Sequence, residues 1–227
     1  MTIPLVIGLT GGSGSGKSEV ARVLRGFGAV AVDADEVSRE AADDPDVLSR
    51  LKAALGDWVV GVDGRFDRKA VGRRVFSDRN ALEALTVITH DYIIKAIDER
   101  VRAYRAGQGA GYGAVHGAWH GGAAPALVLD APLPVRRGFL DNVDVVWAVV
   151  CDVSKKVERI VSRDGIDAEL ARARLAAQMA DADYARLADV VLTNNGSLAD
   201  LERSARQAWD SLWPIPSFGG GSGGHYG

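Results

Sequence analysis

The chain has 227 residues, of which 27 are Lys or Arg and 30 are Asp or Glu, so its formal net charge at pH 7 is −3. Apolar residues make up 47% of the chain and charged residues 25%, which excludes wholesale disorder and predicts one domain, with at most a small appended lobe. The mildly acidic balance argues against a surface that binds nucleic acid along its whole length.

The first half of the chain predicts two short strands and then a group of helices. The predicted elements, in chain order, are a strand at 3–9, a helix at 17–25, a strand at 29–32, and helices at 45–55, 67–76 and 80–104. Asp44 and Pro45 suit the N-cap and the first position of the helix predicted at 45–55, which we expect to stop at Gly56.

The second half predicts strands alternating with helices. The expected elements are strands at 126–129, 143–150 and 190–192, and helices at 154–161, 167–179 and 197–212. The run 143–150 is apolar almost throughout, which is typical of a central strand, and Ser197 with Asp200 predicts a capping box. Strands that alternate with helices predict a mostly parallel sheet covered on both faces.

Two segments are rich in glycine and lack hydrophobic periodicity. We expect 106–125 to be a flexible insertion and 214–227 to be a disordered tail. No apolar run reaches the roughly 18–20 residues that a membrane helix needs, and the N-terminus lacks the basic stretch of a signal peptide. A single cysteine, Cys151, excludes an intrachain disulfide, and its apolar surroundings predict a buried thiol. We therefore expect a cytoplasmic protein with no membrane partner and no evident obligate protein partner.

The glycine-rich segment at 11–18 carries the clearest chemical signal. It reads Gly-Gly-Ser-Gly-Ser-Gly-Lys-Ser and fits the phosphate-binding pattern G-x-x-x-x-G-K-[ST] between a predicted strand and a predicted helix. Glycines let successive N–H groups turn toward an anion, and the helix start adds partial positive charge. Lys17 can reach the outer phosphates and the Ser18 hydroxyl can ligate Mg²⁺. A chance Gly/Ser linker is the alternative, and a GTPase switch lacks its guanine-reading motifs here.

Three aspartates follow predicted strands. Because carboxyl ends of parallel strands gather at one edge of a sheet, Asp33, Asp35 and Asp130 are expected near the phosphates. An aspartate there can position or deprotonate an acceptor hydroxyl, and we favour Asp35 over Asp33 for this role. The alternative is that either residue only caps the following helix. Asp130 could hold Mg²⁺ through water, or it could be only a polar strand end.

An arginine-rich segment later in the chain predicts a lid. Arg163 precedes an Asp-Gly turn, and Arg172, Arg174 and Gln178 follow on the next predicted helix. An arginine carried by a closing lid can neutralise charge on the transferred phosphoryl group, and we expect Arg163 and Arg174 to do so. A solvated arginine-rich helix face is the alternative.

Taken together, these segments resemble the dephospho-CoA kinases over residues 3–213. The resemblance is carried by Leu-Thr-Gly-Gly-Ser-Gly-Ser-Gly-Lys-Ser at 9–18, Val-Asp-Ala-Asp at 32–35, Gly-Arg-Phe-Asp-Arg at 64–68, Leu-Asp-Ala-Pro-Leu at 129–133, Arg-Leu-Ala-Ala-Gln-Met at 174–179 and Asn-Asn-Gly at 194–196. It implies ATP-dependent phosphorylation of the ribose 3′-hydroxyl of dephospho-CoA, the last step of coenzyme A synthesis.

The resemblance also implies a fold. It is an α/β P-loop kinase fold, a parallel five-stranded sheet sandwiched by helices, with a helical acceptor-binding lobe and a lid. The implied boundaries are a core at 1–35 and 126–213, an acceptor lobe at about 36–105, the insertion at 106–125 and a lid at about 163–180.

Roles follow from the resemblance by position. The nucleotide side, with ATP and Mg²⁺, falls on Gly12, Ser13, Gly14, Ser15, Gly16, Lys17, Ser18, Glu19 and Asn195, of which Asn195 would lie near the adenine and Ser18 would bind the metal. The acceptor side falls on Asp33, Arg68, His90 and Asp130, with Asp35 as the base. Arg163 and Arg174 belong to the lid.

Three positions depart from the family pattern. Glu19 stands where the family usually has Thr, Asp91 where it has Pro, and Pro134–Arg137 where it reads Leu-Phe-Glu. We expect Glu19 to point away from the phosphates, which it would otherwise repel. The other two departures fall in the acceptor half. A related kinase for a nucleoside monophosphate or a sugar-like alcohol, or a non-catalytic nucleotide-binding module, therefore stays an alternative.

Overall fold

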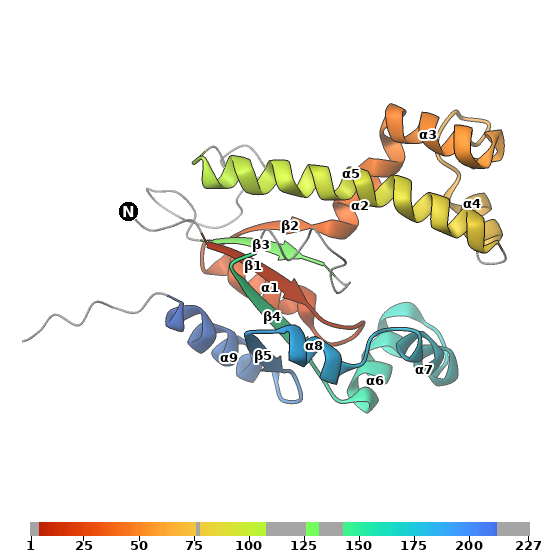
Figure 1. Cartoon of the computed structure of the whole chain (residues 1–227). Helices are drawn as coiled ribbons and strands as arrows, with labels where there is room; N and C mark the ends of the chain where they lie inside the picture. Colours follow the sequence, from red (N-terminus) through yellow and green to blue (C-terminus); the bar gives the residue numbers. More distant parts are fainter. Residues whose placement is uncertain (1–4, 76–77, 108–125, 132–142, 213–227) are drawn as a thin grey trace, which may run out of the picture.

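The computed structural model describes residues 5–75, 78–107, 126–131 and 143–212 (Figure 1). The elements are β1 (Leu5–Thr10), α1 (Lys17–Gly26), β2 (Val30–Asp33), α2 (Ala34–Asp43), α3 (Pro45–Leu55), η1 (Asp57–Val59), α4 (Arg68–Val75), α5 (Arg79–Arg105), β3 (Ala126–Asp130), β4 (Val145–Val150), α6 (Val153–Asp164), α7 (Ala168–Ala176), α8 (Asp181–Leu187), β5 (Val190–Thr193) and α9 (Leu198–Ser211). None of the helices in these ranges is long and apolar enough to cross a bilayer.

The sheet confirms the predicted fold class. Its 5 strands run in the order β2-β3-β1-β4-β5 and every pair is parallel. The middle place belongs to β1, the strand that leads into the glycine-rich loop. We expected the run at 143–150 to be central, and β4 is an interior strand with a neighbour on each side.

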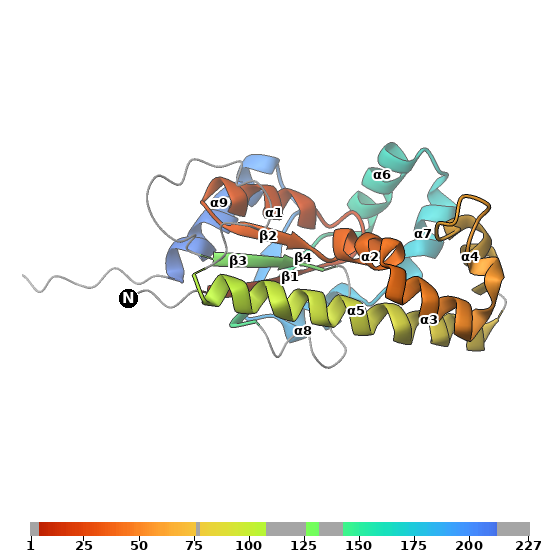
Figure 2. The same ribbon diagram turned by 90° about the horizontal axis from the view of Figure 1, so that it is seen from above.

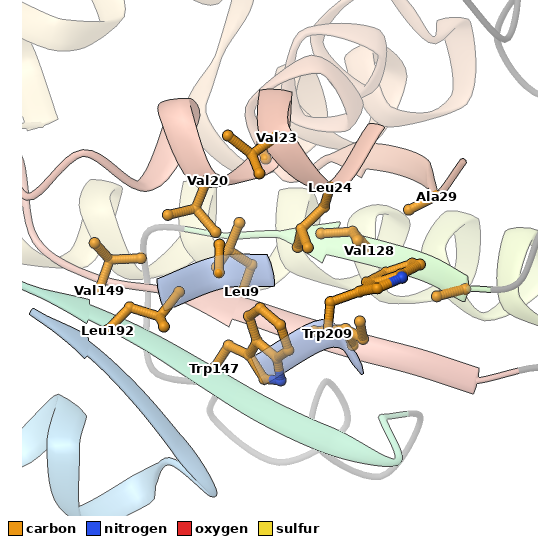
Figure 3. Packing of buried hydrophobic residues seen from close by; sticks show 14 of the residues in the cluster. Leu9, Val20, Val23, Leu24, Ala29, Val128, Trp147, Val149, Leu192 and Trp209 are labelled. Carbon is orange, nitrogen blue, oxygen red and sulfur yellow. The ribbon is translucent and has the colours of Figure 1, made fainter. Parts of the chain in front are cut away.

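One face of the sheet is covered by α1 and α9. Because side chains alternate along a strand, Ile7 and Leu9 point to this face, where they pack with Trp147 from β4 (Figure 3). Trp209 of α9 packs in the same cluster, and the centroid of its ring lies 5.7 Å from the ring centroid of Phe27. The cluster fixes α1 against the strand that precedes it, which positions the loop between them.

The opposite face is covered by α5. Val6 and Leu127 point to this side and pack against Ile97 and Val101 of the helix. Figures 1 and 2 both show α5 running along the sheet and continuing past the carboxyl ends of the strands. There it carries α3 and α4, which form a separate apolar cluster with it. The helices α6 and α7 project beyond the same edge of the sheet (Figure 2).

The predicted elements are confirmed with small shifts at their ends. Asp44 caps α3 through hydrogen bonds from two backbone N–H groups, and Ser197 with Asp200 forms the capping box. The helix predicted at 167–179 is confirmed as α7, which ends three residues early at Ala176, whereas α8, which starts at Asp181, was not predicted. Ala180 has an extended backbone, which separates the two. The predicted insertion and tail lie outside the described residues.

Candidate active site

The loop at 11–16 adopts a backbone that only glycine accepts without strain. Gly11, Gly14 and Gly16 have φ angles of 147°, 74° and 99°. A Cβ atom on Gly11 would lie 2.5 Å from the carbonyl oxygen of Val149, and one on Gly16 would overlap Nδ2 of Asn194. A Cβ atom on Gly14 would lie 2.9 Å from the carbonyl oxygen of Lys156 in α6. The three glycines are therefore required both by their conformation and by the close approach of β4, of α6 and of the segment after β5.

Two side chains hold the loop from behind. Arg159 of α6 donates to the carbonyl oxygens of Gly14 and Ser15 at 3.0 and 3.3 Å, and Asn194 donates to that of Ser15 at 2.7 Å. When the carbonyl groups are held at the back, the N–H groups are left to face an anion in front. Arg159 was not singled out in the sequence, because nothing local marks a residue 145 positions away as a partner of Gly14.

Lys17 is tied to Asp130. The two form an ion pair, and their side chains are only 15% and 7% exposed. The strand register explains the contact, because Asp130 lies opposite Leu9 on one side and Asp33 on the other. Burial raises the pKa of Asp130, Lys17 opposes this shift, and the nearby charge of Asp33 adds to it. Asp130 is thus the ion-pair partner of Lys17, the lysine predicted to bind phosphate, beyond being a polar strand end.

The aspartates at and just after the end of β2, Asp33 and Asp35, lie at the same edge of the sheet. Asp33 is the N-cap of α2, and its Oδ1 accepts a hydrogen bond from the backbone N–H of Asp35 at 2.8 Å. The capping alternative is therefore confirmed for Asp33. The Asp35 side chain is exposed in the first turn of α2. Because β3 separates β2 from β1, Asp33 faces the loop across Asp130.

The first turn of α1 carries Ser18 and Glu19. Ser18 is exposed, next to Lys17. The Glu19 carboxylate accepts a hydrogen bond from Nε of Arg22 at 3.0 Å, and this contact lowers the pKa of Glu19. Glu19 is therefore engaged by Arg22 of its own helix, which partly neutralises its charge.

The residues of the predicted lid differ in their contacts. Arg163 and Arg174 both donate to Asp164, at 2.7 and 3.0 Å, and these contacts lower the pKa of Asp164. Gln178 instead reaches the loop, where its Oε1 accepts from the backbone N–H of Ser13 at 2.9 Å. The structure therefore joins the lid segment to the loop through Gln178 and not through the arginines.

A cavity of about 740 Å³ lies beside the loop, between the ends of β4 and β5 and the helices α6 and α7. Asn195, Leu175, Met179 and Gln178 are among its lining residues. Asn195 is held in place by two hydrogen bonds with Asp152, each 2.8 Å long. A cavity whose wall combines apolar side chains such as Leu175 and Met179 with a fixed amide suits a flat aromatic base.

The predicted acceptor residues lie on the helices that project from the sheet. Arg68 is the first residue of α4 and is exposed, and His90 is half-buried in α5. The structure places them on the α3–α5 side of the sheet edge, apart from the lid. Asp91 forms ion pairs with Arg50 and Lys95, which lower its pKa.

Comparison with known proteins identifies the family of this chain. A family model described as dephospho-CoA kinase matches residues 5–112 and 116–200. The dephospho-CoA kinase of Geobacter sulfurreducens is 37% identical over 210 residues, covering 92% of this chain and 99% of the relative. That of Thermobifida fusca is 33% identical over 209 residues, covering 92% and 96%.

Solved structures give the same result for the fold. A Thermus thermophilus protein superposes with a TM-score of 0.72 at 32% identity, covering 92% of this chain and 98% of the other. A dephospho-CoA kinase from Campylobacter jejuni gives a TM-score of 0.65 at 21% identity, with 91% and 96% covered. A phosphate-binding loop on a five-stranded parallel sheet, a family model matched over most of the length and relatives at this identity lead to one conclusion: the chain belongs to the dephospho-CoA kinase family.

Proposed function

We propose that this chain transfers the γ-phosphoryl group of ATP to the ribose 3′-hydroxyl of dephospho-CoA, which yields coenzyme A and ADP. The observation that carries the proposal is the loop at 11–18 with Lys17 held by Asp130, beside Asp33 and Asp35 at one edge of the sheet. A phosphate-binding cation and candidate acceptor-side carboxylates therefore meet at one place, which phosphoryl transfer to an alcohol requires.

ATP would lie with its phosphates on the loop and its base in the cavity beside Asn195. Arg159 and Asn194 hold the carbonyl groups of Gly14 and Ser15, which supports a loop whose remaining N–H groups are available to an anion. Lys17 would exchange part of its contact with Asp130 for a phosphate oxygen. This exchange leaves the buried amine paired throughout, so no isolated charge arises during binding.

Asp35 would act on the acceptor. The hydroxyl oxygen attacks the γ-phosphorus, the bond from that phosphorus to the β,γ-bridging oxygen breaks, and the hydroxyl proton passes to the Asp35 carboxylate. Asp33 accepts the backbone N–H of Asp35 and so fixes the first turn of α2. The exposed Asp35 side chain is free to meet a substrate, whereas the carboxylate of Asp33 serves as the cap.

The donor groups at this edge suit Mg²⁺. Ser18 offers a hydroxyl in the first turn of α1, and Asp33 and Asp130 are paired in register at the end of β2 and β3, so the donors are oxygen atoms, which this ion prefers. Ser18 would bind the ion directly together with the phosphates of ATP. When bound, the ion neutralises charge on the phosphate oxygens.

The arginines of the lid would act after movement. Arg163 and Arg174 are both bound to Asp164, and their side chains are largely exposed. Exposed ion pairs contribute little free energy, about 1 kcal/mol or less, so phosphate oxygens can take the place of Asp164. The arginines would then neutralise charge on the phosphoryl group and help exclude water.

An acceptor panel tests the proposal. The protein is incubated with radiolabelled ATP, Mg²⁺ and, in separate reactions, dephospho-CoA, nucleoside monophosphates and sugar-like alcohols. We expect labelled coenzyme A from dephospho-CoA and little product from the others. Preferred transfer to another acceptor would overturn the substrate assignment, and ATP binding without transfer to any acceptor would overturn the assignment as an enzyme.

The role of Asp35 has its own test. Asp35→Asn keeps the shape of the side chain but cannot accept the proton, so we expect kcat to fall by about 100-fold or more while ATP binding is kept. Glu36→Gln removes a charge from the next exposed residue of the same turn and serves as the control. An unchanged kcat in Asp35→Asn would remove the base from this position.

A further inference from the structure

A second lysine lies at the phosphate-binding loop. Lys156 of α6 is 4% exposed, and its Nζ forms an ion pair with Asp181, the first residue of α8. The same Nζ lies 3.4 Å from the position that a Cβ on Gly12 would occupy. Lys156 and Asp181 both line the cavity that Asn195 also lines. This lysine was not among the residues that the sequence pointed to.

Gln178 marks the same part of the loop as a place for an oxygen acceptor. Its Oε1 accepts the backbone N–H of Ser13 and lies 3.2 Å from the Cβ position of Gly12. The amide oxygen of Gln178 therefore accepts the hydrogen bond of a loop N–H group, and the ammonium group of Lys156 lies beside the same part of the loop. A donor N–H group and a cation within reach of one another form the usual surroundings of a phosphate oxygen.

We propose that Lys156 is a second polyphosphate-binding cation for ATP, which Asp181 holds at the loop until the nucleotide replaces the carboxylate. The proposal rests on the proposed use of ATP and adds a residue to that site. Upon binding, a phosphate oxygen would take the Nζ of Lys156 from Asp181. The amide of Gln178 would leave the N–H of Ser13 at the same time.

The geometry of Asp181 permits this exchange. A buried amine is costly without a partner, so Lys156 needs either the carboxylate or a phosphate. Asp181 is 27% exposed, so water can solvate its carboxylate once Lys156 leaves. Its other oxygen accepts the backbone N–H of Cys151 at 3.0 Å, which keeps the side chain in place. Two lysines therefore lie at the loop, Lys17 of α1 and Lys156 of α6. Each is paired with a carboxylate that a phosphate can replace.

Two substitutions of opposite expected sign test the proposal. Asp181→Asn keeps the acceptor for the N–H of Cys151 but removes the charge that competes for Lys156, so we expect ATP to bind several-fold more tightly. Lys156→Gln removes the cation, and we expect the Kd for ATP to rise about 10- to 100-fold, the range for one hydrogen bond to a charged group. Lys155→Gln makes the same change one residue earlier on α6 and is expected to leave the Kd for ATP unchanged.

Calorimetric titrations with ATP, ADP and adenosine provide the measurement. Adenosine has no phosphate, so its affinity should stay the same in every variant. Circular dichroism checks the fold, and the double variant Lys156→Gln/Asp181→Asn leaves no unpaired buried charge if the single variant unfolds. That double variant should bind ATP weakly. Wild-type affinity for ATP in the double variant, or an Asp181→Asn variant that binds ATP no more tightly than wild type, overturns the proposal.

These titrations contain no acceptor. A failure of dephospho-CoA as substrate would therefore leave their result intact, while loss of the effect of Lys156 would leave the acceptor assignment intact.

Discussion

Replacing Lys17 by Met tests the energetics of the pair beneath the loop. The substitution keeps an unbranched apolar side chain but removes the ammonium group, so Asp130 is left 7% exposed without its cation. Burial already raises the pKa of Asp130, and Lys17 opposes that rise. The variant lacks the charge of Lys17 that lowers this pKa, so the folded-state pKa of Asp130 moves further above its value in the unfolded chain.

The expected loss of stability follows from the free energy needed to protonate the Asp130 carboxylate. A stranded carboxylate can bind a proton, and for a carboxyl of ordinary pKa, about 3.9, this costs about 4 kcal/mol at pH 7 and about 1.5 kcal/mol at pH 5. Breaking a buried pair costs about 3–5 kcal/mol, which agrees with the value at pH 7. Stability contributed by the protonated carboxyl is complete below about pH 4 and is lost as pH rises through the folded-state pKa.

Urea denaturation followed by circular dichroism at pH 5 and pH 7 measures this difference. We expect Lys17→Met to lose about 4 kcal/mol at pH 7 and less than about 2 kcal/mol at pH 5. The double variant Lys17→Met/Asp130→Asn has no buried charge to strand and should regain about half of the loss at pH 7 or more. Equal losses at both pH values, or no recovery in the double variant, would refute this account of the pair.

Three further predictions concern other parts of the molecule. Ser197→Ala removes one half of the capping box with Asp200, so the free energy of unfolding should fall by about 1 kcal/mol in urea denaturation. Trp209→Ala empties a 7% exposed site against Phe27 and should cost about 3–5 kcal/mol, and a loss below 1 kcal/mol would contradict the packing. Arg174→Ala should change the free energy of unfolding by less than about 1 kcal/mol, because its present partner is an exposed carboxylate. The same variant should lower kcat about 100-fold in steady-state kinetics, because it removes a charge proposed to neutralise the transferred phosphoryl group.

Local rules were sufficient for much of this fold. The strand, glycine turn and helix at the start of the chain are each specified by residues close together in sequence, and so are the caps at Asp44 and Ser197. The parallel order of strands and helices follows from their alternation. Asp33 shows where such rules end, because one side chain satisfied both a helix cap and a place beside Asp130.

The contacts across the loop could not be predicted from local patterns. Gln178 meets Ser13 over a separation of 165 residues, and Arg159 meets Gly14 over 145. Lys156 lies on a helix whose sequence gives no sign that its amine is buried against Asp181. The break between α7 and α8 also depends on contacts that are distant in sequence. The extended backbone at Ala180 lies between Gln178, which contacts the loop at Ser13, and Asp181, which pairs with Lys156.

The length of α5 sets the reach of the helices that it carries. Its 27 residues span about 40 Å at 1.5 Å per residue, whereas the strands of 4–6 residues beneath it span at most about 20 Å. Roughly half of the helix therefore overhangs the sheet, as Figure 2 shows. The length of α5 therefore sets the distance between α4 and the loop. Adding or deleting one turn of α5 would shift α4 by about 5 Å relative to the loop, and so change the length of the proposed acceptor that fits between them.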